Sequence, residues 1–225
     1  MTPDEFTELA GGTFRSKRTW RRMRSRDKNR LFWDFYRSEW ARGTSLYAQT
    51  DVRRLRESKR HSIEHIVPRS MLKDALLSRS RRLCNGATCN PLNMAAVHRR
   101  LNRARGSAEF DFEMDPVIRP VGRGRRRGRR QVVLGFDYQG EWVVPPARQG
   151  EIARVILYMA FVYGLPWSTL PRVERLRDWA RADRPSKDEK AFSTWTRARW
   201  RIGNPLVEDA SRIEDQELFA KTGRG

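Results

Sequence analysis

The sequence RHSIEHIVPRSM, residues 60–71, places an acid and a histidine inside a short apolar run. The β-branched residues of this run favour a strand, and Pro68 should end it, because proline cannot donate to a sheet ladder. We therefore expect a short strand over 60–68. Glu64 offers a hard oxygen ligand, and His65 is mostly neutral at pH 7, as a proton acceptor must be. A regular strand would turn the two side chains to opposite faces. On a basic protein, such a pair can also be two ordinary polar side chains exposed to solvent.

The 225-residue chain carries a formal net charge of +20 and has 38% hydrophobic and 10% aromatic residues. It holds enough apolar side chains for a core, and its pI of about 11.2 predicts a polyanionic partner, first nucleic acid and second an anionic membrane surface. No apolar run reaches about 18 residues, so we expect no membrane span. The acidic start without an apolar stretch argues against a signal peptide, which predicts an intracellular or particle-associated protein.

Periodicity predicts an α+β, mainly helical domain with a small antiparallel β-sheet. Residues 1–12 are expected to be a flexible leader, 13–205 a single domain, and 206–225 a loosely attached tail. The stretch 69–82 is compatible with a short helix or a loop. The expected helices lie within 13–42, 90–105, 151–163, 171–182 and 187–201. A basic loop at 122–130 precedes a hairpin that turns at Gln139-Gly140.

Three side-chain groups have more than one interpretation. Cys84 and Cys89 are reduced thiols, a local disulfide, or half of a zinc site completed by His98. In the helix expected over 90–105, His98 would share a face with Asn102, either as a metal or phosphate contact or as a surface histidine. The tryptophans at 179, 195 and 200 could stack on bases, although their helical spacing favours core packing.

Four blocks of the chain, in order between about residues 60 and 210, carry a resemblance to a known family. They are IEHIVPRS (63–70), LNMAAVHRRLNRARGS (92–107), PPARQGEIARVILYMAFVYGL (145–165) and GNPLVED (203–209). Together they are similar to the motifs of the bacterial endonuclease I family, which are non-specific, metal-dependent nucleases of the ββα-metal (His-Me finger, HNH-like) class. Four blocks in register are a more specific signal than any one alone.

The resemblance implies a ββα-metal core over about 60–110, with the C-terminal helices over 151–201 packed around it. It implies that Glu64 and Asn102 bind one divalent metal ion, Mg²⁺ or alternatively Mn²⁺ or Ca²⁺, and that His65 is the general base. Asn93 would hold the backbone behind the histidine. Arg105 would be a phosphate contact or a structural contact.

The resemblance also implies an arginine that stabilises charge in the transition state. The connecting loop offers Arg79, Arg81 and Arg82 for this role, and we prefer Arg82 or its neighbour. Contacts with nucleic-acid phosphates are expected from Arg69, Arg81, Arg99, Arg105, Arg125, Arg126, Arg127, Arg129 and Arg130. The basic loop at 122–130 would grip phosphates in a salt-dependent, sequence-independent way, although like-charge runs are also often merely solvated.

The chain departs from the family pattern at several positions. The family's histidine before the first asparagine is Leu92 here, its proline is Ala96, and its last motif residues are changed at 104–107. We expect a monomeric, metal-dependent endonuclease that hydrolyses DNA, with RNA as a second candidate substrate. The alternatives are a nucleic-acid-binding or packaging protein without turnover, and a structural component of a virion or another large assembly.

Overall fold

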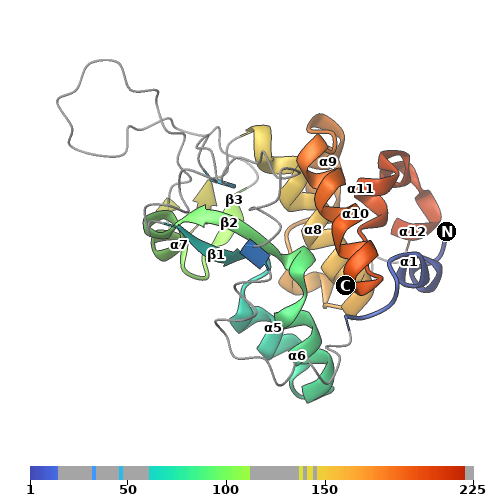
Figure 1. Cartoon of the computed structure of the whole chain (residues 1–225), viewed down its shortest axis with the longest axis horizontal. Helices are drawn as coiled ribbons and strands as arrows, with labels where there is room; N and C mark the ends of the chain where they lie inside the picture. The colour runs from blue at the N-terminus through green and yellow to red at the C-terminus, as the bar shows by residue number, and fades with distance from the viewer. Residues whose placement is uncertain are drawn as a thin grey trace.

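The computed structural model describes residues 1–14, 32–33, 46–47, 61–111, 137–138, 141–143 and 146–220. The expected basic loop at 122–130, with Arg125, Arg126, Arg127, Arg129 and Arg130, lies outside the described residues. So does most of the segment 13–42, of which residues 32–33 are helical. Within the described part the protein is α+β and predominantly helical (Figure 1). None of the described helices combines the length and the apolar composition needed to cross a bilayer.

Helix α8 (Pro146–Tyr163) occupies the centre of the fold. In Figure 1 the paired strands β1 (His61–His65) and β2 (Met94–His98) lie to one side of it, and the C-terminal helices lie to the other. From residue 156 to its last residue every side chain of α8 is buried, as expected of a helix covered on all sides. The expected stop is confirmed, because Gly164 directly after the helix has φ +59°, a conformation that suits glycine.

The remaining described helices surround α8. They are α1 (Pro3–Leu9), α5 (Arg69–Leu76), α6 (Arg81–Cys89), α7 (Arg99–Arg105), α9 (Val173–Ala182), α10 (Lys187–Trp200), α11 (Pro205–Glu208) and α12 (Gln216–Phe219). Short 3-10 turns are η1 (Pro91–Asn93), η2 (Trp167–Thr169) and η3 (Ala210–Glu214). The stretch 69–82, for which helix and loop were both open, contains all of α5 and the start of α6. The helices expected near 171–182 and 187–201 are confirmed as α9 and α10.

Within the stretch 60–68, expected to be a short strand or a strand-like turn, residues 61–65 form β1, and the strand ends three residues before Pro68. It pairs with β2 in antiparallel register from His61 opposite His98 to His65 opposite Met94. The prediction of helix throughout 90–105 was wrong, because residues 94–98 form β2 and only α7 is helical. Alanine favours a helix by a few tenths of a kcal/mol per residue. Here the backbone pairing with β1 and the burial of Ala95, Ala96 and Val97 outweigh that preference.

The two faces of the β1–β2 pair pack against different apolar groups. Ala95 and Val97 of β2 join the main core around α8. Ala96 faces the other way and packs with Phe32 and Trp33 in a second cluster, to which Ile63 and Met94 also belong. Because cross-strand partners share a face, Glu64 opposite Ala95 lies on the main-core side, and His65 opposite Met94 lies on the side of the second cluster.

A second, three-stranded sheet consists of β3 (Glu109–Asp111), β5 (Glu141–Val143) and β4 (Asp137–Tyr138), in that order. Strands β4 and β5 are antiparallel, which confirms the expected hairpin for its described residues. Strand β3 pairs with β5 in parallel, a contact that the sequence did not suggest. This sheet begins four residues after α7, and Phe110 of β3 packs against Arg105 at the end of that helix.

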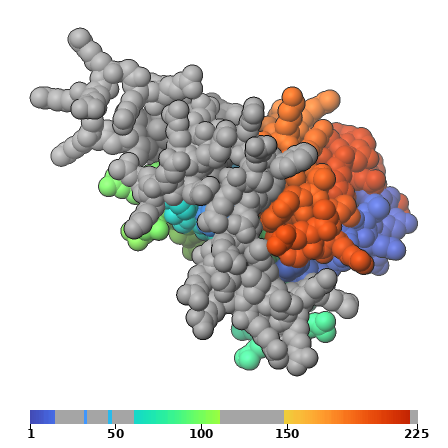
Figure 2. All heavy atoms as spheres, viewed as in Figure 1, coloured from blue at the N-terminus to red at the C-terminus, as the bar shows by residue number. Residues whose placement is uncertain are grey.

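Residues 1–12 and 206–220 both pack on the fold, which differs from two expectations. Residues 1–12, expected to be a flexible leader, contain α1, whose Thr2 side chain closes a capping box with Glu5. Phe6 of this helix is fully buried, with its ring centroid 5.0 Å from that of Phe161. The tail expected from 206 onward contributes buried apolar side chains up to Phe219. In Figure 2 the N-terminal segment lies against the C-terminal helices at one end of the molecule.

Neither cysteine forms a disulfide: Cys84 is buried and Cys89 is partly buried in α6. The described residues contain no group of three or more histidine, cysteine, aspartate and glutamate side chains suited to a metal ion, so the zinc interpretation gains no support. Of the three tryptophans, Trp179 is buried, whereas Trp195 and Trp200 are half-buried and their ring centroids lie 4.8 Å apart.

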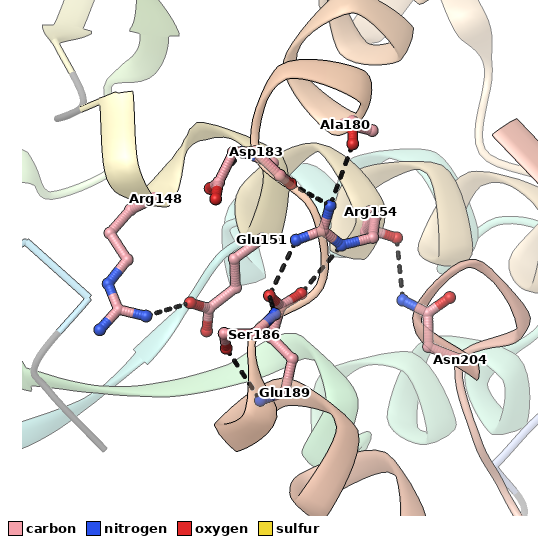
Figure 3. Close-up of polar contacts among 9 residues, drawn as sticks. Arg148, Glu151, Arg154, Ala180, Asp183, Ser186, Glu189 and Asn204 are labelled. Carbon is pink, nitrogen blue, oxygen red and sulfur yellow. Dashed lines mark hydrogen bonds and ion pairs between the residues drawn. The ribbon is translucent and has the colours of Figure 1, made fainter. Parts of the chain in front are cut away.

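A buried arginine ties three helices together (Figure 3). Arg154 of α8, 1% exposed, donates from Nε and Nη2 to the two carboxylate oxygens of Glu189 in α10, at 2.9 and 2.8 Å. Its Nη1 donates to the main-chain carbonyls of Ala180 and Asp183 at the end of α9. Burial and the neighbouring Glu151 carboxylate raise the pKa of Glu189 to about 7, against the lowering effect of Arg154. Arg154 therefore sets the angle at which α9 and α10 meet α8.

We predict that Arg154→Met lowers the free energy of unfolding by about 3–5 kcal/mol, because it leaves Glu189 buried without a countercharge. The loss should be larger at pH 8 than at pH 5.5. Arg154 lowers the pKa of Glu189, so its removal raises that pKa further, and the carboxyl of the variant is protonated and neutral at pH 5.5. The stability of the variant then falls as pH rises through this raised pKa. Urea unfolding at both pH values measures this. Arg181→Met, which breaks an exposed pair with Glu214, is the control and should cost about 1 kcal/mol or less.

Candidate functional site

Glu64 is buried in a polar cluster beneath the β1–β2 pair. Its side chain is 3% exposed, and its Oε1 accepts a hydrogen bond of 2.7 Å from the Tyr47 hydroxyl and forms an ion pair with the Arg105 guanidinium. Burial raises the pKa of the Glu64 carboxyl above its usual value, while Arg105 and Tyr47 act in the opposite direction. Oε2 has no hydrogen-bond partner among the described residues. The carboxylate is thus held by one oxygen and open at the other.

Arg105, the last residue of α7, organises the end of β1. Besides the ion pair with Glu64, it donates to the main-chain carbonyls of His65 at 3.1 Å and Ile66 at 3.0 Å. Its Nε donates to the carbonyl of Ala108 at 3.2 Å, and its guanidinium carbon lies 4.1 Å from the ring centroid of Phe110. The Arg105 side chain is 1% exposed, so the expectation that it contacts nucleic acid was wrong. Its donors are already used inside the protein.

Asn102 lies one turn before Arg105 on the same side of α7. Its Nδ2 donates to the Ser62 hydroxyl at 3.0 Å and to the main-chain carbonyl of Ile63 at 2.8 Å. Together with Arg105 it covers carbonyls of β1 that would otherwise lack a partner at the edge of a two-stranded sheet. Because both donors of the amide are used in this way, Oδ1 is the group left over, and it has no partner among the described residues.

The two oxygens left over are chemically suited to a magnesium ion. A carboxylate oxygen of Glu64 and the amide oxygen of Asn102 are both hard ligands, and Mg²⁺ commonly takes only one or two protein ligands and keeps several waters. Both residues also use their other polar atoms to fix themselves to β1 or α7, which would hold the remaining oxygens in place. The nearby Arg105 charge opposes a cation, so the residues fit a weakly bound ion.

His65 ends β1 and is held from the other side by the end of α6. Its Nε2 lies 3.1 Å from the main-chain carbonyl oxygen of Thr88. A carbonyl can only accept, so Nε2 carries the proton and the lone pair of the neutral ring is on Nδ1. Nδ1 has no hydrogen-bond partner among the described residues. Burial, together with the charges of Arg69 and Arg105, lowers the pKa of His65 to about 4, against the opposing effect of the Thr88 carbonyl.

Glu64 and His65 do not converge on one face of the strand. The register of β1 with β2 is uninterrupted through His65, and the pleat therefore turns the two side chains to opposite faces, as expected of a regular strand. The edge of β1 that lies along α7 connects the face of Glu64 with the face of His65. Ser62 accepts from Asn102 and also lines a cavity that includes His65 and Arg99, so the Asn102 amide lies next to the cavity of the imidazole.

Asn93 and His98 both form side-chain hydrogen bonds with backbone groups. Asn93 is fully buried, and its amide accepts from the Val67 N–H at 2.8 Å and donates to the Val67 carbonyl at 3.0 Å. It thereby fixes the turn directly after His65. His98 was expected on a helix face with Asn102, which was wrong. It ends β2 and caps α7, where its Nδ1 accepts from the Arg100 N–H.

The arginines expected near the histidine have different locations. Arg81 and Arg82 are exposed in the first turn of α6, about 10.5 and 9 Å along the helix axis from Thr88, and no contact among the described residues joins them to His65. Arg79 donates to the carbonyl of Gly164 and is used structurally. Arg69, the exposed first residue of α5, is the cation whose charge acts most strongly on His65. Of the candidates for a phosphate contact in this stretch, Arg69 is the one near the imidazole.

Sequence reasoning missed three contributors to the site: Tyr47, Ser62 and Thr88. Tyr47 is fully buried and reaches Glu64 from a segment without any motif. The neighbouring Leu46 is placed by a hydrogen bond from its N–H to the carbonyl of Ala96 in β2. Thr88 acts through its carbonyl, which any residue could provide. Ser62 lies two residues before Glu64 and would share its face in a strand, which is the one signal that was present.

Comparisons with known proteins give no relative. The sequence matches no protein-family model, and no curated protein is similar to it. The functional argument therefore depends on the positions of Glu64, His65, Asn102 and their partners, together with the four sequence blocks in which they occur.

We predict that His65 stays neutral across the physiological range. Its imidazole should titrate well below 6.5, near pH 4, because burial and neighbouring cations disfavour the charged ring. A pKa depressed in the folded state gives a stabilising contribution of about 3 kcal/mol that is present above pH 6.5 and is lost as pH falls toward 4. NMR titration of the histidine rings, with His65→Gln for assignment, measures this. A His65 ring that titrates at 6.5 or above would contradict the prediction.

Proposed function

We propose that the protein is a metal-dependent endonuclease that hydrolyses phosphodiester bonds of DNA, with RNA as a second substrate class. The observation that carries the proposal is the environment of His65: a neutral imidazole with one nitrogen committed to a carbonyl and the other left as a proton acceptor beside a cavity. The arrangement β1–β2–α7, with Glu64 and His65 on the first strand and Asn102 on the helix, supports it, because this order matches the ββα-metal core implied by the resemblance.

In this proposal the proton acceptor and the metal ligands lie on opposite faces of β1. Nδ1 of His65 takes a proton from the attacking water, and the Thr88 carbonyl keeps the ring in the tautomer that this requires. Glu64 and Asn102 would hold a divalent ion, which when bound neutralises charge on the phosphate and on the departing oxygen. Arg69 offers a positive charge to the substrate phosphate near the imidazole. Arg105 and Asn93 position the backbone at His65 and directly after it.

One observation favours a second candidate, a nucleic-acid-binding protein without turnover. Glu64 already has a countercharge in Arg105 and a donor in Tyr47, so its burial is explained without any metal ion. In that case the charge of +20 would still give salt-dependent binding to nucleic acid. The two candidates differ only in whether phosphodiester bonds are broken, and a single variant separates them.

We expect the protein to nick supercoiled plasmid DNA in the presence of Mg²⁺ and to lose this activity in EDTA. His65→Ala should reduce the rate by about 10²–10⁴-fold, the usual contribution of a general base. Asn102→Ala should raise the Mg²⁺ concentration needed for half-maximal rate. Agarose-gel quantification of nicked and linear DNA measures both, and circular dichroism checks that each variant is folded.

His98→Asn is the matched control for the histidine. It removes an imidazole from the far end of the same strand pair, and asparagine preserves the cap of α7, so cleavage should be unchanged. If wild type and His65→Ala nick DNA equally, the activity comes from elsewhere and the proposal fails. Tight, salt-sensitive binding of DNA without Mg²⁺-dependent nicking would establish the second candidate.

A further inference from the structure

A cavity of about 460 Å³ lies beside His65 on the face of β1 opposite Glu64. Its volume is within the usual range for ligand pockets, roughly 300–1,000 Å³. The cavity extends along the strand from His65 to His61, and from α7 it includes Arg99. The cavity is therefore continuous with the proposed reaction site. It also includes residues that have no role in the proposed reaction.

The apolar part of the cavity consists of Ile63, Met94 and Trp33. Ile63 and Met94 are half-buried, so each keeps apolar surface that the second core cluster leaves uncovered. Trp33 is 8% exposed and forms a rigid wall, with its ring centroid 4.3 Å from that of His61. This gives a flat apolar surface between two imidazoles, which suits the face of a sugar or a base better than a solvated ion.

The polar part is cationic. Arg99 is exposed in the first turn of α7 and lines the cavity, three residues before Asn102, so the two face the same side of the helix. Ser62, which binds the Asn102 amide, lines the cavity as well. Among the lining residues that the structure describes no carboxylate is present, so these residues present a positive charge and neutral polar groups to whatever enters. An anionic group bound by Arg99 would lie toward the Asn102 end.

We propose that this cavity binds one nucleotide of the polynucleotide, next to the bond that is cut. Arg99 holds that nucleotide's phosphate, and its sugar and base lie against Ile63 and Met94 with Trp33 as the wall. This inference rests on the proposed function for the position of the cut bond, but the binding of a nucleotide does not require cleavage. Arg99 thereby gains a defined role, as the residue that aligns the chain so that the scissile phosphate faces His65.

The experiment is NMR titration of the full chain, without metal, using thymidine 5′-monophosphate and inorganic phosphate as probes. The nucleotide should shift the ring resonances of both His61 and His65, and should bind about tenfold more tightly than phosphate because it also covers apolar surface. Arg99→Met should weaken nucleotide binding by about tenfold or more. Arg100→Met removes the same charge from the adjacent position, outside the cavity, and should change binding by less than about twofold.

Met94→Gln tests the apolar part separately, since it should remove the advantage of the nucleotide over phosphate while leaving phosphate binding intact. Three results would overturn the inference: histidine rings that do not shift, equal effects of the two arginine variants, or phosphate that binds as tightly as the nucleotide. The proposed function fails independently. If the nucleotide binds through Arg99 and plasmid DNA is never cut, the nucleotide-binding inference is supported and the proposed nuclease activity is refuted.

Discussion

The ion pair between Arg105 and Glu64 is the contact on which the β1–β2–α7 unit depends. A two-stranded sheet has two open edges and too few hydrogen bonds to be stable alone. Arg105 compensates at one edge by donating to the carbonyls of His65 and Ile66, and the negative charge of Glu64 keeps the guanidinium buried there. A buried pair of this kind contributes little net stability, since desolvation offsets the attraction. The pair instead fixes the orientation of α7 against β1, because any other angle of α7 would leave a buried charge unpaired.

The same contact explains how a regular strand can serve a site with two unlike halves. The pleat separates Glu64 from His65, so the hard oxygen ligands and the proton acceptor lie on different faces. Helix α7 runs along the edge between these faces and offers Asn102 to one and Arg99 to the other. A substrate phosphate that lies across this edge would meet both halves without a bulge in the backbone. Under the proposed function, the separation would also keep the imidazole from competing for a bound cation.

Sequence reasoning located the motif residues but not the contacts that give them their roles. The strand at Glu64 and His65 could be predicted because its apolar residues, its β-branching and Pro68 all indicate the same structure. The strand at 94–98 could not, since MAAVH favours a helix locally and becomes extended only by pairing with β1. The role of Arg105 was equally hidden. An arginine in a +20 chain looks like a phosphate contact, and only the partners at its guanidinium show that it is internal.

The positive charges around His65 keep the imidazole unprotonated but also weaken it as a base. A bound phosphate would offset the second of these effects. Arg69 and Arg105 lower the pKa of the imidazole, which keeps it unprotonated at neutral pH but makes it a weaker base. A phosphodiester near Arg69 brings a negative charge, which offsets that of the arginine and raises the pKa of the ring toward the operating pH. Under the proposed function, His65 would therefore be strongest as a base when the substrate is bound. Exposed Arg69 is screened by salt and the buried Arg105 is not, so this coupling belongs mainly to Arg69.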